Sequence, residues 1–545
     1  MSATTDIIGV AGPRTVVCVV DETRRDMATA RDAVAGRFTH NGVTLDLGTR
    51  PDWRSSGLAH DVEWRTEWAK ANEGLDLAHA YGVTGDLRFV STWQELVTSY
   101  VARVPVGHDR SEVSARRMQN WLYAWQRFRE AGAPVAPDVV ETMTARLRAD
   151  AAHLAAHLTP ERNHRTLELY ALVLVGLALD DRAAAAHALG LLTANAERDV
   201  LPDGVHRERS SDYHMIVLRS LVGAVANARA AGLAVPPALV DRTGSAATFG
   251  LHLQRPDGLT PALSDGDVGD FRPLLLRAGT LLDRPDLTWA ATAGGRGTPP
   301  ADRGASFPHG GYATVRSGWG DGVRDYDHEW FGVFDAGPLG DGGHGHYDHL
   351  AVELWGDGRP LVVDAGRYTY ADGDDGWRRW FKGTAAHNTA TVDGLDQTEY
   401  RPGKPKGPTS SARLGHRVHD GAVDLVTGTA ISPRYDAVHA RAVALVGACR
   451  WVVHDRLRAP TDHDYAVRWH LPPGGTGTAT VTRRGGDHVV EAAGVRITVP
   501  GRCGDVTIED GWISPAYGLK LPAPVVVVRT AGPDADVVTT IEAGS

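Results

Sequence analysis

The spacing of apolar residues changes near residue 290 of this 545-residue chain, and that change limits the folds it can adopt. Before this point apolar residues recur every three or four positions, which is typical of amphipathic helices. We expect seven long helices, at 93–104, 114–129, 139–158, 165–179, 183–194, 211–230 and 237–253. Because short connections favour antiparallel helix pairs, this half is predicted to form a helical array or toroid.

After residue 311 the pattern consists of short β-branched runs separated by turns rich in Gly, Asp and Pro. These runs predict strands at 330–334, 351–355, 360–363, 389–392, 423–427, 442–446, 478–482, 495–499 and 525–529. Many short strands at such spacing indicate a β-sandwich. Helices that all precede the strands indicate separate domains rather than an α/β unit.

The length exceeds what one hydrophobic core supports, so several segments are expected. Residues 1–60 are predicted to be an N-terminal segment with short strands, including a buried strand at 15–20, and a helix near 26–36. Residues 61–290 form the predicted helical domain and 311–545 the predicted sheet domain. Residues 291–310 are rich in Gly, Pro, Arg and Ser, and this composition predicts a linker.

Composition excludes several classes of protein. The formal net charge of −10 argues against a nucleic-acid binder, so an anionic ligand would need a local basic pocket. The three cysteines are far apart, which favours reduced thiols. No signal-like N-terminus and no apolar run long enough for a membrane span is seen. We therefore expect a cytoplasmic protein that binds neither nucleic acid nor membrane; its Ala, Arg, Gly and Val content is typical of a high-GC bacterium.

Candidate metal ligands lie in the sheet half. His344 and His346 are two residues apart in a Gly-rich segment, so on a strand both imidazoles would face the same side. Asp364 follows one predicted strand and His387 precedes another. Two imidazoles and one carboxylate, from His346, Asp364 and His387, form the ligand set of a metal site with an open position. On spacing alone, ordinary hydrogen-bonded histidines explain the pattern equally well.

Three segments of this region resemble the heparinase II/III family of polysaccharide lyases, alginate lyase-like relatives included. They are Gly-His-Gly-His-Tyr-Asp-His-Leu-Ala-Val-Glu-Leu at 343–354, Leu-Val-Val-Asp-Ala-Gly-Arg-Tyr-Thr-Tyr at 361–370, and Trp-Arg-Arg-Trp-Phe-Lys-Gly-Thr-Ala-Ala-His-Asn-Thr at 377–389. Segments 116–125, 162–165 and 203–214 of the helical half are also similar to the family. The resemblance implies an N-terminal (α/α) toroid followed by a C-terminal antiparallel β-sandwich.

The same resemblance places His346, Asp364 and His387 on the family's metal ligands and implies one zinc ion per chain. We expect that metal to be a scaffold that positions the neighbouring His344, rather than a catalytic Lewis acid.

The resemblance also implies a catalytic set and a reaction. It places His344 on the catalytic histidine, Tyr213 on the catalytic tyrosine, and Asn163 on the residue that engages the substrate carboxylate, with His164 as an alternative for that role. The implied reaction is β-elimination from a uronic acid in an acidic glycan or oligosaccharide. It leaves a 4,5-unsaturated uronate end.

This reaction requires three kinds of group. Loss of the C5 proton builds charge on the neighbouring carboxylate, which a donor such as Asn163 would stabilise. A base must remove the proton and an acid must protonate the departing oxygen. We assign Tyr213 as the acid, and also as the base for a syn elimination, and His344 as the base or a partner of the carboxylate. The substrate's stereochemistry leaves both arrangements open, and the site is expected in the crevice between the two domains.

Other residues are weaker candidates. Arg165, Arg367 and Arg379 are charged residues near the motifs and are candidates for substrate binding, although surface arginines are often simply solvated. Glu208 is a candidate for orienting a catalytic group or for pairing with a cation.

Three other functions remain open. A cytosolic lyase or dehydratase could act by elimination on an anionic small molecule, and a glycan-binding protein could keep the fold without the activity. A glycoside hydrolase would need a pair of carboxylates across a cleft, and none is recognisable in the sequence. Substrate identity, endo or exo action and oligomeric state are not fixed by the sequence; a homodimer is one of the states left open.

Overall fold

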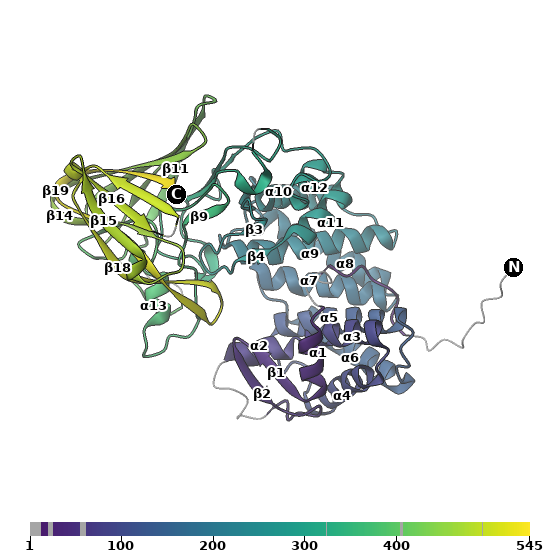
Figure 1. The fold of residues 1–545 in the computed structure, drawn as a ribbon. Helices are drawn as coiled ribbons and strands as arrows, with labels where there is room; N and C mark the ends of the chain where they lie inside the picture. Colours follow the sequence, from purple (N-terminus) through teal and green to yellow (C-terminus); the bar gives the residue numbers. More distant parts are fainter. Residues whose placement is uncertain are drawn as a thin grey trace. The chain divides into compact units, whose positions relative to one another are not determined.

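The computed structural model describes residues 12–19, 25–54, 62–322, 324–403, 407–492 and 494–544 (Figure 1). The chain divides into two compact units. The first comprises Met1–Asp199 and Arg219–Asp241, and the second Val200–Leu218 and Arg242–Ser545. The boundary therefore runs through helices α9 (Ser211–Ala230) and α10 (Pro237–Leu253), rather than through the predicted linker.

Over its described residues the first unit is helical, apart from one two-stranded hairpin. Besides parts of α9 and α10 it contains α1 (Met27–Val34), the hairpin strands β1 (Arg37–His40) and β2 (Val43–Asp46), α2 (Val62–Ala69), α3 (Glu73–Thr84), α4 (Leu87–Arg103), α5 (Ser111–Glu130), α6 (Pro137–Ala156), α7 (Arg162–Ala178) and α8 (Arg182–Asp199). The predicted helices at 93–104, 114–129, 139–158, 165–179 and 183–194 correspond to α4 through α8.

Helices α3, α5 and α7 pack against one another in sequence, while α4 packs on α6 and α8 on α7. This alternation of inner and outer helices agrees with the predicted (α/α) arrangement. Local signals define the ends of α3 and α4. Gly85, with φ of +71°, ends α3 in the left-handed conformation that glycine adopts without strain, and the Asp86 carboxylate accepts the Arg88 N–H to cap α4.

The predicted strand at 15–20 is not formed over the residues that the structure describes there, 15–19. Two of its backbone N–H groups donate to side chains instead: Val16 N to Gln126 Oε1 at 2.9 Å and Val17 N to Asn227 Oδ1 at 2.7 Å. A β-branched run whose donors are satisfied by helix side chains needs no neighbouring strand, although Val16 and Val19 are buried as predicted.

The second unit contains the remaining helices and two large antiparallel sheets. Its helices are the first part of α9, most of α10, α11 (Arg272–Leu282), α12 (Pro285–Ala291) and α13 (Trp377–Lys382). Its strands are β3 (Leu259–Thr260), β4 (Gly269–Asp270), β5 (Ala305–Phe307), β6 (Tyr312–Arg316), β7 (Phe331–Asp335), β8 (Ala351–Gly356), β9 (Arg359–Val362), β10 (Ala390–Val392), β11 (Ser411–His419), β12 (Val423–Ile431), β13 (Val438–Val446), β14 (Arg450–His470), β15 (Ala479–Arg484), β16 (Asp487–Ala492), β17 (Val495–Val499), β18 (Asp505–Ala516) and β19 (Leu519–Ala543).

One sheet has five strands in the order β5-β6-β7-β8-β9. The other has ten strands, in the order β11-β12-β13-β14-β19-β17-β16-β15, with β10 added on β14 and β18 on β19. The long strands β14 and β19 pair along most of their lengths and lie in the middle of the strand order.

The core of the second unit lies between these two sheets. Phe334, Leu350 and Leu354 from the five-stranded side form one buried cluster with Val443 and Trp451 from the ten-stranded side. Gly332 permits this packing, because a Cβ there would lie 2.7 Å from the Trp451 ring. The predicted architecture of helices followed by an antiparallel β-sandwich is confirmed. Within the described parts of the chain, no helix is both long and apolar enough to span a bilayer.

Candidate functional site

Tyr213 and His344, the two predicted acid–base residues, stack directly on each other in the second unit. Their ring centroids are 3.9 Å apart and the ring planes differ by 27°. Tyr213 lies in the first turn of α9, and its hydroxyl is 2.9 Å from the Tyr370 hydroxyl. His344 follows a short 3-10 turn at Asp341–Gly343. Residues 131 positions apart in sequence therefore form one pair in space.

Asp265, which sequence reasoning missed, organises the site. It is fully buried in the connection between β3 and β4. Its carboxylate accepts hydrogen bonds from His344 Nδ1 at 3.0 Å and from His346 Nε2 at 2.9 Å. Arg378 of α13 donates to both oxygens, at 2.5 and 2.8 Å. The charged Arg378 and the two imidazole hydrogen bonds overcome the effect of burial and hold the pKa of Asp265 well below its usual range.

His344 and His346 lie in a loop rather than on a strand, so the alternation of a strand does not set their directions. Both imidazoles nevertheless turn to the same side, because both donate to Asp265. An ionised carboxylate can only accept, so Nδ1 of His344 carries the proton of this hydrogen bond, and in the neutral ring Nε2 has the lone pair. That Nε2 is 4.0 Å from Oε1 of the buried Glu208. Glu208 is thus placed to stabilise a cationic His344.

The Tyr213 hydroxyl lies in a low-dielectric environment with one cation near it. Burial raises the pKa of Tyr213 well above its usual value, and Arg367 and the bond to Tyr370 offset only part of that effect. Arg367 donates to the Tyr370 hydroxyl and makes two bonds to Asp267, at 2.9 and 2.7 Å. The phenol is therefore protonated at neutral pH.

A metal-competent cluster lies beside this pair. His346, Asp348 and His387 are buried, and one ligand atom from each lies within 4.8 Å of the others. Nδ1 of His346 is buried without a hydrogen-bond partner within the described residues, while Nε2 is bonded to Asp265. Burial lowers the pKa of His346 to about 3, so its Nδ1 carries a lone pair. A carboxylate–imidazole pair with a free nitrogen is the arrangement that supports a metal ion.

Asp364, the predicted third ligand, lies next to that cluster. Its Oδ2 accepts from His387 Nδ1 at 2.9 Å, and its Oδ1 accepts the Gly366 N–H. Although burial opposes it, Asp364 and Asp348 raise the pKa of His387 to about 9. An oxygen and a nitrogen that share a tetrahedral zinc lie roughly 3.3 Å apart. At 2.9 Å the Asp364–His387 contact is a hydrogen bond, and Nε2 of His387 also lies 3.0 Å from the Phe381 carbonyl oxygen, so these atoms would have to separate slightly to share an ion. Asp348 is a further carboxylate of the cluster that was not predicted from the sequence.

The remaining candidates are distributed unevenly. Arg379 is exposed, whereas Arg378 and Lys382 of the same helix contact the site. Lys382 Nζ donates to Gly343 O at 2.7 Å and so ties α13 to the loop that carries His344 and His346. A helix places residues one position apart about 100° apart around its axis, so adjacent arginines could not be told apart from spacing.

Asn163, His164 and Arg165 lie on α7 of the first unit. Asn163 is buried, His164 Nδ1 is 4.0 Å from Glu112 Oε2, and Arg165 donates to Thr159 O at 2.7 Å. Tyr213 belongs to the second unit, and each unit is described by itself. The role of Asn163 and an active site between the two domains therefore stay predictions.

Two family models match this chain, and both describe the heparinase II/III family. The model described as "Heparinase II/III N-terminus" matches residues 14–276 and the one described as "Heparinase II/III-like, C-terminal" matches residues 299–542. A heparin-sulfate lyase of Bacteroides stercoris is 22% identical over 521 residues, covering 88% of this chain and 75% of that protein.

Solved structures share the fold. A heparan sulfate lyase mutant from Pedobacter heparinus superposes with a TM-score of 0.70 at 21% identity, covering 97% of this chain and 84% of that one. A heparinase III structure gives a TM-score of 0.81 at 18% identity, covering 100% and 88%. At these identities the likeness shows a common architecture of helical toroid and β-sandwich.

Proposed function

We propose that this protein, which belongs to the heparinase II/III family and is a carbon–oxygen lyase, cleaves a uronic-acid-containing glycan by β-elimination. The observation that carries the proposal is the stacked pair of Tyr213 and His344, with His344 held by Asp265. A protonated phenol against an imidazole with a free nitrogen provides an acid and a base at one point.

In the proposed reaction His344 Nε2 removes the C5 proton of the uronate. The electron pair of that C–H bond forms the C4=C5 double bond, the C4–O bond breaks, and Tyr213 donates its hydroxyl proton to the departing oxygen. Asp265 keeps Nδ1 of His344 protonated, so that Nε2 is the basic atom. Glu208, 4.0 Å from Nε2, stabilises the imidazolium that forms.

Arg367 and Tyr370 position the acid. The Tyr370 hydroxyl is 2.9 Å from that of Tyr213 and accepts from Arg367, whose guanidinium is fixed by two bonds to Asp267. The Tyr213 hydroxyl is therefore held in a network whose geometry is set before substrate arrives, and little reorganisation is needed during proton transfer.

We also propose one zinc ion per chain, held by His346, His387 and a carboxylate from Asp364 or Asp348. The residues fit such an ion, because Nδ1 of His346 is buried, has no hydrogen-bond partner in the described structure and lies within a cluster of possible ligand atoms. When bound, the ion would supply a cross-link between the loop that carries His346 and the segments after β9 and before β10, where Asp364 and His387 lie. Asp265 would then connect the two functions, since it bonds both His344 and His346.

The elimination is tested with a panel of uronate-containing glycans, oligosaccharides and small uronates. We expect a rise in ultraviolet absorbance from the conjugated unsaturated uronate with a sulfated or unsulfated acidic glycan. Activity on small uronates alone would favour the small-molecule alternative over the glycan. A panel that gives no absorbance change with metal-loaded protein would contradict the proposed activity.

Metal analysis tests the zinc site independently of activity. We expect about one zinc per chain in the wild type and loss of most of it in His346→Ala, because this variant removes the buried Nδ1 that has no hydrogen-bond partner in the described structure. Between Asp348→Asn and Asp364→Asn, the larger loss identifies the carboxylate ligand. The exposed His328→Gln serves as control. Full metal in both His346→Ala and the two carboxylate variants would rule out the site.

A further inference from the structure

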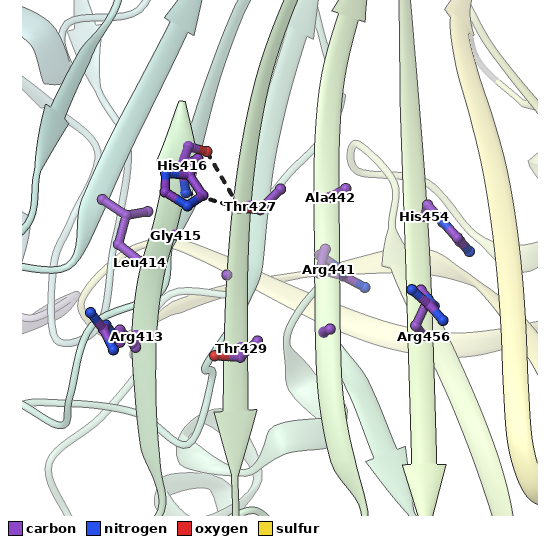
Figure 2. Close-up of a pocket in the computed structure, with 12 residues that line it drawn as sticks. Arg413, Leu414, Gly415, His416, Thr427, Thr429, Arg441, Ala442, His454 and Arg456 are labelled. Atoms are coloured by element: carbon purple, nitrogen blue, oxygen red, sulfur yellow. Dashed lines mark hydrogen bonds between the residues drawn. The ribbon is translucent and has the colours of Figure 1, made fainter. Parts of the chain in front are cut away.

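A groove in the ten-stranded sheet is lined by none of the residues of the catalytic pair or the metal cluster (Figure 2). It has a volume of about 630 Å³ and is formed by strands β11 to β14. Its charged and polar lining includes Arg413, His416, Thr427, Thr429, His454 and Arg456. All of these residues belong to the second unit.

Strand register gives the groove a floor of small side chains and long cationic walls. Thr429 of β12 pairs with Arg413 of β11 on one side and with Ala440 of β13 on the other, and Ala440 pairs with Arg456 of β14. Directly paired residues share one face of a sheet. This row therefore places two arginines on one face, separated by a threonine and an alanine.

The next row repeats the arrangement with histidines. Thr427 pairs with Ala442, which pairs with His454 on β14. On the β11 side the pairing is irregular after Leu414, and the His416 N–H donates to Thr427 Oγ1 at 3.0 Å. A Cβ on Gly415 would lie 2.4 Å from that oxygen, so only glycine permits the close approach that brings His416 beside the groove.

Cations outnumber carboxylates around this groove. Arg413 is exposed, and within the described parts of the chain no carboxylate forms an ion pair with Arg413 or His416. On the opposite wall, His454 and Arg456 share a single carboxylate, Asp536, at 2.9 and 3.5 Å. Asp536 also bonds Arg458. In a chain with a net charge of −10, this local excess of positive charge favours an anionic ligand.

We propose that the groove is a second binding site for an acidic glycan, separate from the catalytic pair. Guanidinium groups bind carboxylates and sulfates through paired hydrogen bonds, and the methyl groups of Ala440 and Ala442 provide an apolar floor for the C–H face of a sugar. Arg413 and Arg456 stand three strands apart, roughly 14 Å, so they reach anionic groups on different sugars. The choice of glycan rests on the proposed function, but binding does not require turnover.

Binding is measured in the Tyr213→Phe background, in which cleavage is expected to be slowed by about 10²-fold or more. The probe is a fluorescently labelled long heparan sulfate chain at fixed salt. We expect Arg413→Gln/Arg456→Gln to weaken binding by about tenfold or more, since each removes charged hydrogen bonds. The matched control is Arg483→Gln/Arg484→Gln on β15, which makes the same charge change outside the groove and should retain wild-type affinity. Unchanged affinity in the groove variant, or an equal loss in the control, would overturn the proposal.

A second variant separates the groove from its charge. Ala442→Leu fills the floor and leaves every cation in place, so it should also weaken binding if the chain lies in the groove. Single-stranded DNA that binds as tightly as the glycan and responds to the same variants would overturn the assignment to glycan. In the active enzyme, the groove variants should raise KM for the long chain and leave turnover of a short oligosaccharide unchanged. A glycan that binds the groove but is not cleaved would contradict the proposed lyase activity and leave the proposed binding site standing.

Discussion

Tyr213→Phe is expected to lower kcat by about 10²–10⁴-fold with little change in KM. The variant removes the one proton that the leaving oxygen needs, whereas the ring that stacks on His344 stays in place. The loss should be largest for substrates with poor leaving groups, since these depend most on protonation. Initial rates with the best glycan from the panel measure the effect.

A matched tyrosine separates this effect from a change in packing. Tyr435 packs against the sandwich core. Tyr435→Phe should keep wild-type activity, and both variants should unfold near the wild-type temperature. Activity in Tyr213→Phe within a few-fold of wild type would show that another group protonates the leaving oxygen and would remove Tyr213 from the mechanism.

Asp265→Asn is expected to lower kcat by about 10²-fold or more and to weaken zinc binding by roughly 10–100-fold. The isosteric amide can no longer accept from His344, His346 and Arg378 at once, so the basic nitrogen of His344 is no longer fixed. Kinetics and metal content are measured on the same preparation. Loss of both activity and metal in this one variant would show that Asp265 links the proposed zinc ligand His346 to the catalytic base His344.

The substitution also leaves Arg378 buried without its partner, which costs about 3–5 kcal/mol of folding free energy. The double variant Asp265→Asn/Arg378→Met removes that charge and should recover most of the lost stability. Activity should stay low in the double variant if Asp265 positions His344. If activity returned together with stability, Asp265 would have only a structural role.

The helical half was predictable because its apolar spacing is local. Helices α5 through α10 begin and end within a few residues of the predicted ranges, since caps and short connections are encoded beside the helices themselves. The prediction of a strand at 15–20 was wrong because of contacts with distant parts of the chain. Its donors are satisfied by Gln126 and Asn227, more than 100 residues away.

The site was predictable only in part. Tyr213 and His344 belong to segments similar to a known family, and the structure places their rings against each other. Asp265 could not be found, because its partners lie 79, 81 and 113 residues further along the chain and its own segment reads as a polar turn. Asp348 was missed, and Arg379 was chosen over Arg378, for a similar reason: burial distinguishes these residues from their neighbours, and spacing alone does not report burial.

Elimination is the central claim, and the products formed in water labelled with heavy oxygen test it most directly. Each cut by β-elimination breaks the C4–O bond without adding water. Mass spectrometry should therefore show a new unsaturated uronate end and no heavy oxygen at the cleaved bond. Saturated products that carry one heavy oxygen per cut would mean hydrolysis, and would contradict the roles given to Tyr213 and His344.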